Sequence, residues 1–353
     1  MNEKLLFLWW TMNPSHRVLV TGFEPFGGHA TNISQAVALG LAGGRTVVCP
    51  WSDESIDVQV DVAILTVDQS GAQTIAQRIH NGEQWDAILH LGLCETCTAP
   101  RVERLAHDWL NMRIPDNQGR QVLGHPLDGE GHRGCWLDLS LWDNDRFPVK
   151  FTVSCDAGAY LCNETYHATL KAQSMHQREP GMPSPTLFLH LPSEQRISVQ
   201  TALDFVEVCL GYMIRPSPKP PTHVVAACLS DGERVLVTQR SLTESDGGLW
   251  EFPGGKCEPG EGWSQGLVRE MMEELSLKVA AKFPLGSWYR ERGESAFLVH
   301  LISTRLLDES AELQLSVHQD AKWISNDANA SLEWAGRDGE MAAFLLEAFK
   351  PMS

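Results

Sequence analysis

Four prolines within six residues divide this sequence into two parts. The stretch PSPKPP, Pro216 to Pro221, follows an apolar segment with helical spacing. Because proline lacks the backbone N–H and fixes φ, these residues end that helix and predict a stiff, extended spacer. The 353 residues suffice for two domains that each bury a core. We therefore expect domains over residues 17–215 and 222–350, joined by a linker over 216–221.

Strand-like and helical runs alternate between residues 17 and 215. The strand-like runs include RVLVTGF, DVAILTV, DAILHLGL, FTVSCDAG and TLFLHLP, and VQTALDFVEVCLGYMI predicts a closing helix. This alternation predicts an open α/β/α sheet covered by helices on both faces. After the linker come strands at HVVAACLS and RVLVTQRS, a glycine-rich turn, an acidic helix, further strands at AFLVHLIS and AKWIS, and a last helix near residues 340–349.

Residues 1–16 precede the first expected strand. They contain an apolar run of about eight residues, which is too short to span a membrane and lacks a small-residue cleavage site. We expect this leader to be disordered, and Met1 and Met12 are both candidate start residues.

The charge and cysteine content of the chain limit which classes of binding partner and which cellular compartment we expect. Lys and Arg number 28 against 45 Asp and Glu, a formal charge of −17. This offers no broad basic surface for nucleic acid or an anionic membrane, so small-molecule or peptide substrates are expected. The nine cysteines are scattered and odd in number, which argues against a disulfide framework and favours the cytoplasm. Cys94 and Cys97 form a CxxC, but no second pair completes a zinc site. The oligomeric state is left open.

The segment GGKCEPGEGWSQGLVREMMEELSL, residues 254–277, places glutamates on one helix face. Glu270, Glu273 and Glu274 lie at i, i+3 and i+4, where like charges repel by roughly 0.2–0.5 kcal/mol per pair. A hard divalent cation would cancel this repulsion, because such ions prefer oxygen ligands. Arg269 precedes Glu273 by four residues and can orient it. The alternative, a solvated acidic face, explains neither the preceding WEFPGG nor the fixed distance to Glu261.

These residues resemble the Nudix hydrolase signature, G-x5-E-x7-R-E-U-x-E-E-x-G-U with U apolar, within about residues 222–350. The resemblance implies an α/β/α sandwich, dependence on Mg²⁺ with Mn²⁺ as an alternative, and cleavage of a nucleoside diphosphate linked to another group. It assigns a carbonyl ligand to Gly254 or Gly255, the principal ligands to Glu270 and Glu274, a further ligand or base to Glu273, and a catalytic role to Arg269. Ser276 stands where the family has glycine.

The flanking VLVTQRS and GGLWEFPGGK resemble the branch that includes 8-oxo-dGTP diphosphatase and CTP pyrophosphohydrolase, which release pyrophosphate from nucleoside triphosphates. On this resemblance Arg240 would contact phosphate, unless it is a plain surface arginine. Asp338 would read the base, unless it is simply exposed. A late-loop carboxylate ligand found in some members would have to be Asp320, or it is absent.

The first half carries a second set of reactive residues. Cys162 follows a strand and lies in the first turns of a helix, where the macrodipole and free N–H groups stabilise a thiolate. His190 follows TLFL at the end of another strand, the edge at which α/β sheets build sites. The alternative is that both residues are structural and buried.

The segments RVLVTGFEPFGG, VERLAHDWLNMRIPDNQG, DAGAYLCN and FLHLP together resemble pyroglutamyl peptidase I over about residues 17–212. In that family a Cys, a His and a Glu remove an N-terminal pyroglutamate. The resemblance assigns the nucleophile to Cys162, the general base to His190 and the third group to Glu103. Phe23 and Phe26 would form apolar walls for the lactam ring, with core packing as their alternative role.

This first half also departs from the family pattern. Cys97 stands where the family has an arginine that helps to hold the thiolate, and Glu95 adds a negative charge, although Arg101 is a candidate substitute. We therefore expect a Mg²⁺-dependent nucleoside triphosphate pyrophosphohydrolase, acting on a modified nucleotide such as 8-oxo-dGTP, fused to a pyroglutamyl-peptidase-like domain. The alternatives are a cysteine peptidase as the main activity, or a degenerate peptidase domain that binds and regulates.

Overall fold

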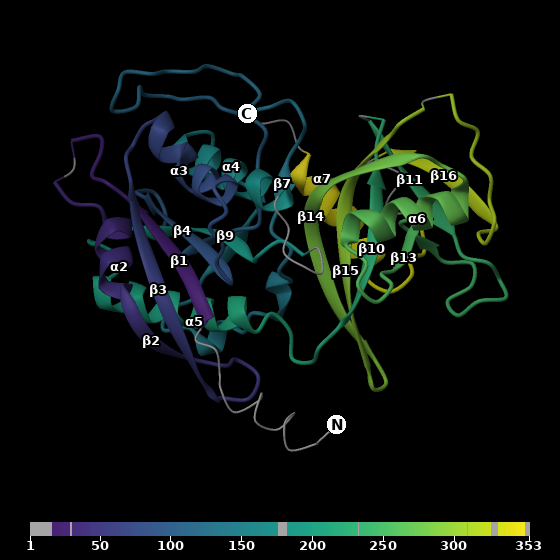
Figure 1. The fold of residues 1–353 in the computed structure, drawn as a ribbon, viewed down its shortest axis with the longest axis horizontal. Coiled ribbons are helices and arrows are strands. Elements are labelled where there is room, and N and C mark those ends of the chain that lie inside the picture. The colour runs from purple at the N-terminus through teal and green to yellow at the C-terminus, as the bar shows by residue number, and fades with distance from the viewer. Residues whose placement is uncertain are drawn as a thin grey trace.

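The computed structural model describes residues 16–28, 30–175, 182–231, 233–308, 310–325 and 331–349. The ribbon forms two lobes joined by one extended connection, with the first half of the chain in one lobe and the second half in the other (Figure 1). The leader expected at residues 1–16 falls outside the described residues except for His16, which begins the first strand. The expected Pro-rich spacer lies between the end of α5 at Ile214 and the start of β10 at Thr222.

Strands and helices alternate through the first half, as the sequence predicts. In chain order its longer elements are β1 (His16–Phe23), α2 (Ile33–Leu41), β2 (Gly43–Val48), β3 (Ser55–Leu65), α3 (Gln69–His80), β4 (Ala87–Cys94), β5 (Arg101–Glu103), β6 (Leu105–Ala106), β7 (Arg133–Gly134), β8 (Thr152–Ser154), α4 (Leu161–Met175), β9 (Thr186–Pro192) and α5 (Val199–Ile214).

A seven-stranded sheet with the order β2-β3-β1-β4-β9-β5-β8 organises this half. The central pairs β3/β1, β1/β4 and β4/β9 are parallel, so these strands end at the same edge of the sheet. Helix α2 packs beside α5 and α3 packs beside α4, and the two pairs cover opposite faces (Figure 1). The predicted α/β/α architecture is confirmed, and the central strands are buried on both faces, as parallel strands usually are.

The second half contains two smaller sheets. Its elements are β10 (Thr222–Leu229), β11 (Arg234–Gln239), β12 (Trp250–Glu251), β13 (Gly254–Lys256), α6 (Trp263–Leu275), β14 (Val279–Arg292), β15 (Ser295–Leu306), β16 (Asp320–Ser325) and α7 (Asp338–Ala348).

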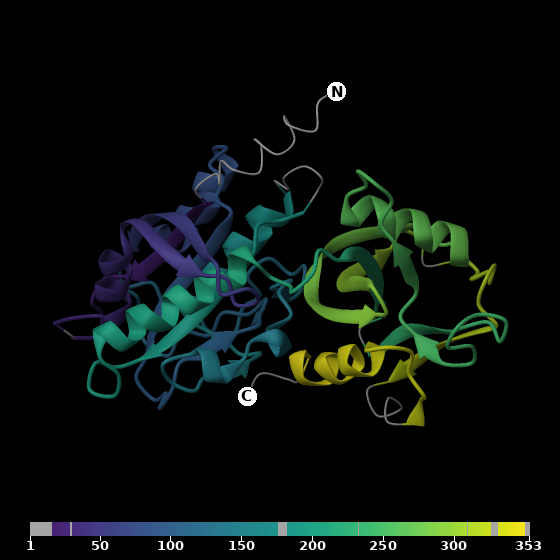
Figure 2. The ribbon, with the colours of Figure 1, turned by 90° about the horizontal axis from the view of Figure 1, so that it is seen from below.

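The two sheets of this half, β13-β10-β15-β14 and β12-β11-β16, lie between two helices. Helix α6 packs against β10, β13 and β14. Helix α7 buries Met341, Phe344 and Leu345 in a separate apolar cluster. Figure 2 shows α6 and α7 on opposite sides of the strands, which is the sandwich that the sequence predicts.

The halves share a packed interface. The guanidinium of Arg104, in the first half, lies 4.5 Å from the ring centre of Trp288 and 4.3 Å from that of Phe344. The rings of Trp136 and Trp263 meet edge to face at 5.8 Å. This contact joins the apolar core of the first half to the face of α6, so the second half is seated on the first.

Within the described residues, no helix combines the length and apolar character needed to cross a bilayer. Several observed strands are absent from the sequence-based expectation, and the two longest of them, β2 and β14, contain glycine or proline. Strand β2 begins at Gly43 and Gly44, and β14 contains Pro284 and Gly286, where the register with β15 shifts. Glycine and proline weaken strand signals, because proline is confined to edges and bulges; β14 is an edge strand.

Candidate functional site

Helix α6 carries the glutamates in the second half of the chain. It begins after Gly262, whose backbone N–H donates to Gln265 Oε1 at 3.1 Å, a capping arrangement that fixes the first turn. It ends at Ser276, which has the left-handed backbone conformation, φ 56° and ψ 25°. The sequence places a serine where this conformation favours glycine.

Arg269 is the centre of the acidic face. Its guanidinium donates to both carboxylate oxygens of Glu261, at 2.9 and 2.8 Å, to Glu270 Oε1 at 2.8 Å and to Glu273 Oε2 at 3.2 Å. The hydrogen bonds with Glu261 contribute most to raising the pKa of Arg269 above its usual value. Arg269 therefore offsets part of the repulsion among the glutamates, which we had expected a bound cation to offset.

Glu274 is the carboxylate that Arg269 does not reach. Its Oε2 atom is buried and has no hydrogen-bond partner among the described residues. Burial, with the nearby charges of Glu270 and Glu251, raises the pKa of Glu274 to about 7, against the opposing effect of His318. A buried carboxylate oxygen without a partner is costly, and a divalent cation would satisfy it.

Gly255 faces the same place. A Cβ at this position would lie 2.4 Å from the Glu270 carboxylate, so only glycine allows the strand to approach the helix this closely. The donor set of backbone carbonyls and carboxylates around Gly254, Gly255, Glu270 and Glu274 therefore fits a divalent cation.

The two expected substrate contacts are held in defined positions. Arg240 donates to Glu251 Oε2 at 2.6 Å and to Glu244 Oε2 at 3.0 Å, so it is an ion-paired residue near the carboxylates. Asp338 Oδ1 accepts the Phe252 N–H at 2.8 Å. Burial raises the pKa of Asp338 to about 7.

The expected catalytic residues of the first half meet in space. Cys162 lies in the first turn of α4, and His190 and Glu103 lie on the adjacent strands β9 and β5. His190 Nδ1 is 2.7 Å from Glu103 Oε1, and both residues are buried. Burial alone would lower the pKa of His190, but hydrogen bonds with Cys162 and Glu103 raise it to about 9. The site therefore holds a protonated imidazole between the Cys162 sulfur and the Glu103 carboxylate at neutral pH.

A cavity of about 850 Å³ opens over these residues. Its wall includes Cys162, His190 and Phe26, so Phe26 is placed as the sequence-based hypothesis requires. Phe23 is not part of the wall; it is 4% exposed and its ring lies 6.4 Å from that of Phe188. Phe23 ends β1 and points into the apolar core, which was its alternative role. The cavity wall also includes Glu347 from α7, in the other half of the molecule.

Cys94, the first cysteine of the CxxC, lies in the wall of the same cavity. Cys94 and Cys97 form a disulfide, and the other seven cysteines carry free thiols. The sequence predicted no disulfide framework and did not foresee this single bridge. Arg101, the candidate substitute for the missing arginine, donates through Nε to Glu103 Oε1 at 2.7 Å. It therefore reinforces the carboxylate that holds His190.

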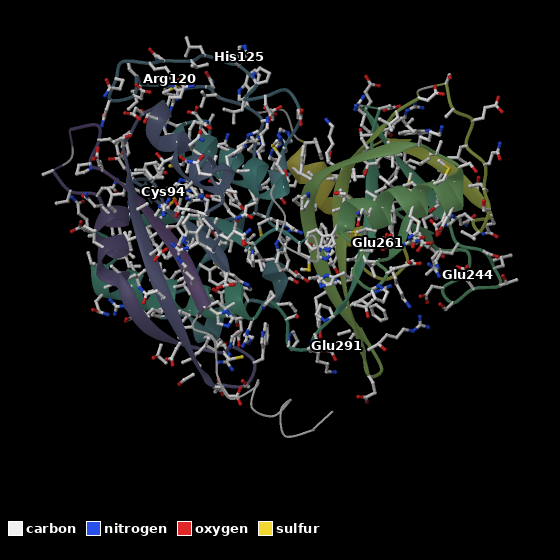
Figure 3. The ribbon with its side chains drawn as sticks, in the orientation of Figure 1. Cys94, Arg120, His125, Glu244, Glu261 and Glu291 are labelled. Atoms are coloured by element: carbon white, nitrogen blue, oxygen red, sulfur yellow. A yellow bond between two sulfur atoms is a disulfide. The ribbon has the colours of Figure 1, made fainter. Side chains whose placement is uncertain are left out.

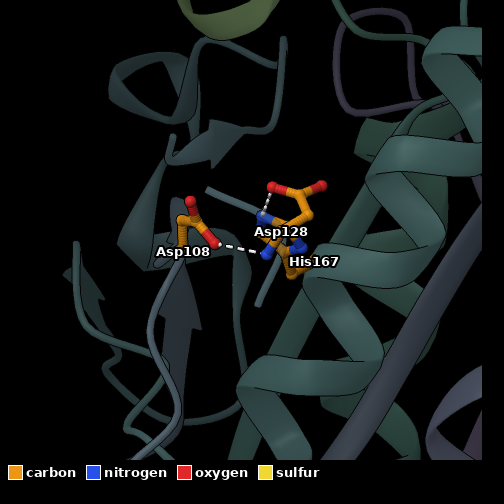
Figure 4. A group of neighbouring side chains, drawn as sticks. All are labelled: Asp108, Asp128 and His167. Atoms are coloured by element: carbon orange, nitrogen blue, oxygen red, sulfur yellow. Dashed lines mark hydrogen bonds and ion pairs between the residues drawn. The ribbon is translucent and has the colours of Figure 1, made fainter. Parts of the chain in front are cut away.

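A third cluster joins Asp108, Asp128 and His167, whose ligand atoms lie within 4.8 Å of one another (Figure 4). Its acceptors are already used. Asp108 accepts the N–H groups of Asp128 and Gly131 at 2.9 and 3.0 Å, and Asp128 pairs with Lys171 and Arg133. Cations of the protein neutralise this cluster, so it stabilises the loop over α4.

Three residues beside the two sites were not identified from sequence. Glu251 lies in the segment WEFPGG. Its position on a strand close to a pair of glycines could have identified it as a site residue. His318 stands in HQDAKW, two residues before the expected Asp320. Asp320 itself is exposed and its Oδ1 accepts the Ala321 N–H at 2.8 Å. Glu347 has no local signal, because only the packing of the halves brings it to the cavity.

The two sites occupy separate lobes, as the positions of Cys94 and Glu261 in Figure 3 illustrate. The family model described as pyroglutamyl peptidase matches residues 16–205, and the NUDIX domain model matches residues 219–345. Each match covers the residues of one site.

Curated proteins resemble the halves separately. The pyrrolidone-carboxylate peptidase of Pyrococcus furiosus is 29% identical over 181 residues, which cover 50% of this chain and 80% of that protein. The CTP pyrophosphohydrolase of Escherichia coli is 36% identical over 127 residues, which cover 36% of this chain and 90% of that protein. Among solved structures, a mutant pyrrolidone carboxyl peptidase from Pyrococcus furiosus aligns with a TM-score of 0.49 and 24% identity, covering 56% of this chain and 98% of that one.

Proposed function

The chain belongs to the pyroglutamyl peptidase family through residues 16–205 and carries a NUDIX domain in residues 219–345, and from this premise we propose two hydrolytic activities. The first is hydrolysis of a nucleoside triphosphate to the monophosphate and pyrophosphate by the NUDIX domain. The substrate is a nucleotide of the kind cleaved by related enzymes, a modified one such as 8-oxo-dGTP or a pyrimidine one such as CTP, the substrate in the name of the Escherichia coli relative.

One observation carries this proposal: at the end of the acidic face that Arg269 partly neutralises, the buried Glu274 Oε2 has no hydrogen-bond partner within the part of the chain that the structure describes. Glu270, Glu274 and a carbonyl of Gly254 or Gly255 would hold Mg²⁺, or Mn²⁺ in its place. When bound, the cation offsets the charge of the pyrophosphate oxygens and activates water. Glu273, exposed and held by Arg269, would act as a further ligand or as the base that accepts the proton of the attacking water.

Pyrophosphate release tests the first activity. Canonical, oxidised and methylated nucleoside triphosphates would be compared with and without Mg²⁺. Glu274→Gln keeps the side-chain volume but removes the charge, so we expect turnover to fall by roughly two orders of magnitude or more while the fold is retained. Glu258→Gln, an exposed glutamate of the same loop, is the matched control. Full activity in Glu274→Gln would contradict the assignment.

The second proposed activity is removal of an N-terminal pyroglutamate in the 850 Å³ cavity of the first half. The Cys162 thiolate would attack the pyroglutamyl carbonyl to form an acyl-enzyme. His190 would donate its proton to the leaving amine and then take a proton from the hydrolytic water, while Glu103 orients the ring. The observation that favours this activity over a pure binding role is the hydrogen-bonded series Cys162, His190 and Glu103.

The pH profile of this second activity follows from His190. Its pKa of about 9 means that the ring is protonated below pH 9, so kcat/KM should fall as the pH rises through 9 and the acid is lost. Glu103→Gln removes a group that raises this pKa, so the falling limb should move to lower pH. Release of a fluorophore from a pyroglutamyl amide measures both profiles.

Two cysteine variants complete that experiment. Cys162→Ala should abolish release, while Cys155→Ala, which removes another thiol of the cavity wall, should retain it. If the intact protein releases no fluorophore at any pH, the result would favour the alternative of a peptidase-like domain that binds a lactam or peptide and regulates the neighbouring domain.

We place both activities in the cytoplasm, with small nucleotides and pyroglutamyl peptides as partners. The formal charge of −17 supports the exclusion of nucleic acid and membranes as partners. The oligomeric state stays open.

A further inference from the structure

The CxxC of the first half has no role in either proposed activity. Cys94 and Cys97 form a disulfide, whereas the other seven cysteines are free thiols. The bridge joins residues only three positions apart, so it restricts the unfolded chain less than a bridge across a long loop would. Disulfides in the cytoplasm, the compartment that we propose, are usually catalytic or redox-sensing. These facts favour a chemical role for the pair over a structural one.

The disulfide lies beside the proposed nucleophile of the peptidase site. A Cβ on Gly92 would be 3.1 Å from Cys162 Sγ, so this sulfur rests directly on strand β4. Gly92 and Cys94 are both in β4 and two residues apart, so Cys94 points to the same face of the sheet, roughly 7 Å farther along it. Cys94 and Cys162 also line the same cavity. The first sulfur of the disulfide and the nucleophile are therefore neighbours in one open space.

Cys94 is placed where the backbone can move. It is the last residue of β4, opposite Pro192, and the exposed residues Glu95 and Thr96 follow it. The ends of elements open more readily than their centres, and both cysteines of the bridge are partly exposed. The disulfide can therefore approach Cys162, and a reductant can reach the disulfide from solvent.

Cys162 is the thiol best placed to attack this disulfide. Thiolates carry out the exchange reaction, and a cation beside a thiol favours the thiolate. His190, which is protonated at neutral pH, is hydrogen-bonded to Cys162. Cys155 is another free thiol of the cavity wall, but burial raises its pKa to about 11, which disfavours its thiolate. The attack would fall on Cys94 Sγ, because Cys94 belongs to the cavity wall.

We propose that Cys94 and Cys97 form a redox switch that controls Cys162 by thiol–disulfide exchange. The Cys162 thiolate attacks Cys94 Sγ, a disulfide forms between these two residues, and Cys97 leaves as a thiolate that takes a proton from solvent. No oxidant is consumed, because one disulfide replaces another. A dithiol reductant, itself oxidised to a disulfide, converts the trapped chain to one with three free thiols. The oxidised chain is thus a reversibly blocked peptidase.

Peptide mapping tests the exchange without relying on activity. Full-length protein isolated without reductant is quenched in acid, alkylated, and digested with trypsin and a proteinase that cleaves before aspartate. Cleavage before Asp156 separates Cys155 from Cys162. We expect disulfide-linked peptides that join Cys94 to Cys162, with Cys97 alkylated, and their disappearance after treatment with dithiothreitol. Absence of these linked peptides, or a link from Cys155 in their place, would overturn the proposal.

Two variants locate the switch. Cys97→Ser removes the bridge with which Cys162 exchanges. After preparation under reductant and transfer to reductant-free buffer, this variant should release the fluorophore from a pyroglutamyl amide as fast as the reduced intact protein. The oxidised intact protein should be severalfold slower until dithiothreitol is added. Cys155→Ala should still form the linked peptides. Thermal unfolding verifies that each variant is folded.

The inference rests on the second proposed activity only for its effect on turnover, so the two can fail separately. If the linked peptides form but the reduced protein releases no fluorophore, the peptidase proposal fails and the exchange stands. If the oxidised and reduced proteins release fluorophore equally fast and no linked peptides form, the peptidase proposal stands and the switch is refuted.

Discussion

Asp338 shows how one enclosed carboxyl makes the second half sensitive to pH. Burial raises its pKa to about 7 in the folded protein, against about 4 when unfolded. A carboxyl with a raised pKa favours the folded state while it is protonated, so its stabilising contribution is present at low pH and is lost as the pH rises through 7. We expect the melting temperature of the intact protein to fall between pH 6 and pH 8 partly for this reason.

Asp338→Asn isolates that contribution. The amide cannot ionise, so the decline in stability as the pH rises toward 7 should be smaller in the variant, by up to roughly 1.4 kcal/mol per pH unit below 7, and the two proteins should change in parallel above 7, where Asp338 is ionised in both states. Melting curves at pH 6 and pH 8 give the difference. Parallel declines in the two proteins would show that Asp338 is already ionised at pH 6. If Asp338 also reads the base, the variant should change the ranking of nucleotides in the pyrophosphate assay.

At the scale of a single element, the backbone at the C-terminal end of α6 is strained. Ser276 has φ 56°, a conformation that costs a residue with a Cβ roughly 1 kcal/mol relative to glycine. Ser276→Gly should therefore stabilise the second half by about 0.5–1 kcal/mol, and Ser276→Ala should not. The unfolding midpoint in denaturant measures this. A lower midpoint for Ser276→Gly would mean that the serine hydroxyl has a stabilising role that outweighs the backbone strain.

At the scale of the whole molecule, the interface between the halves depends on Asp138. This buried carboxylate accepts the Tyr289 N–H at 2.8 Å and the Arg337 guanidinium at 2.6 Å, both from the other half. Asp138→Ala leaves the Tyr289 N–H without this acceptor, at about 1–3 kcal/mol if it stays buried. It also removes one acceptor of Arg337, which still donates to the Tyr289 carbonyl and to Glu340. We expect faster proteolysis within residues 216–221 and a lower melting temperature. Asp145→Ala, an exposed aspartate of the same half, should change neither.

The same interface gives the peptidase cavity a wall from the NUDIX domain. Figure 2 shows the carboxyl end of α7 beside the first half, and Glu347 from this end lines the cavity. The negative charge of Glu347 should favour peptide substrates in which a Lys follows the N-terminal pyroglutamate. Glu347→Lys should lower kcat/KM for such a substrate two- to fivefold relative to one with Glu, as expected for an exposed charge pair, and leave pyrophosphate release unchanged. An equal effect on both peptides would exclude this role.

Local patterns in the sequence predicted the fold class, and they assigned the candidate residues of each site to their helices and strands. Alternating strand and helix runs predicted the α/β architecture of the first half, because periodicity reports which face of each element is buried. The sandwich of the second half was expected from its resemblance to the Nudix family. The spacing from Gly255 to Glu274 defined α6, since helical geometry alone places those glutamates on one face. Cys162 at a helix start and His190 in a strand could likewise be located, because each position depends on its own element.

Other features depended on contacts between residues far apart in the chain, which no local pattern records. Arg269 reaches back to Glu261 across the turn before α6, so the protein itself neutralises charges that the sequence left to a cation. His318, rather than Asp320, approaches Glu251 because of how the segment before β16 folds back. Phe23 belongs to the core, and Glu347 reaches the cavity of the other half. Sequence thus determined which elements form and which residues each presents, whereas tertiary packing decided which of those residues meet.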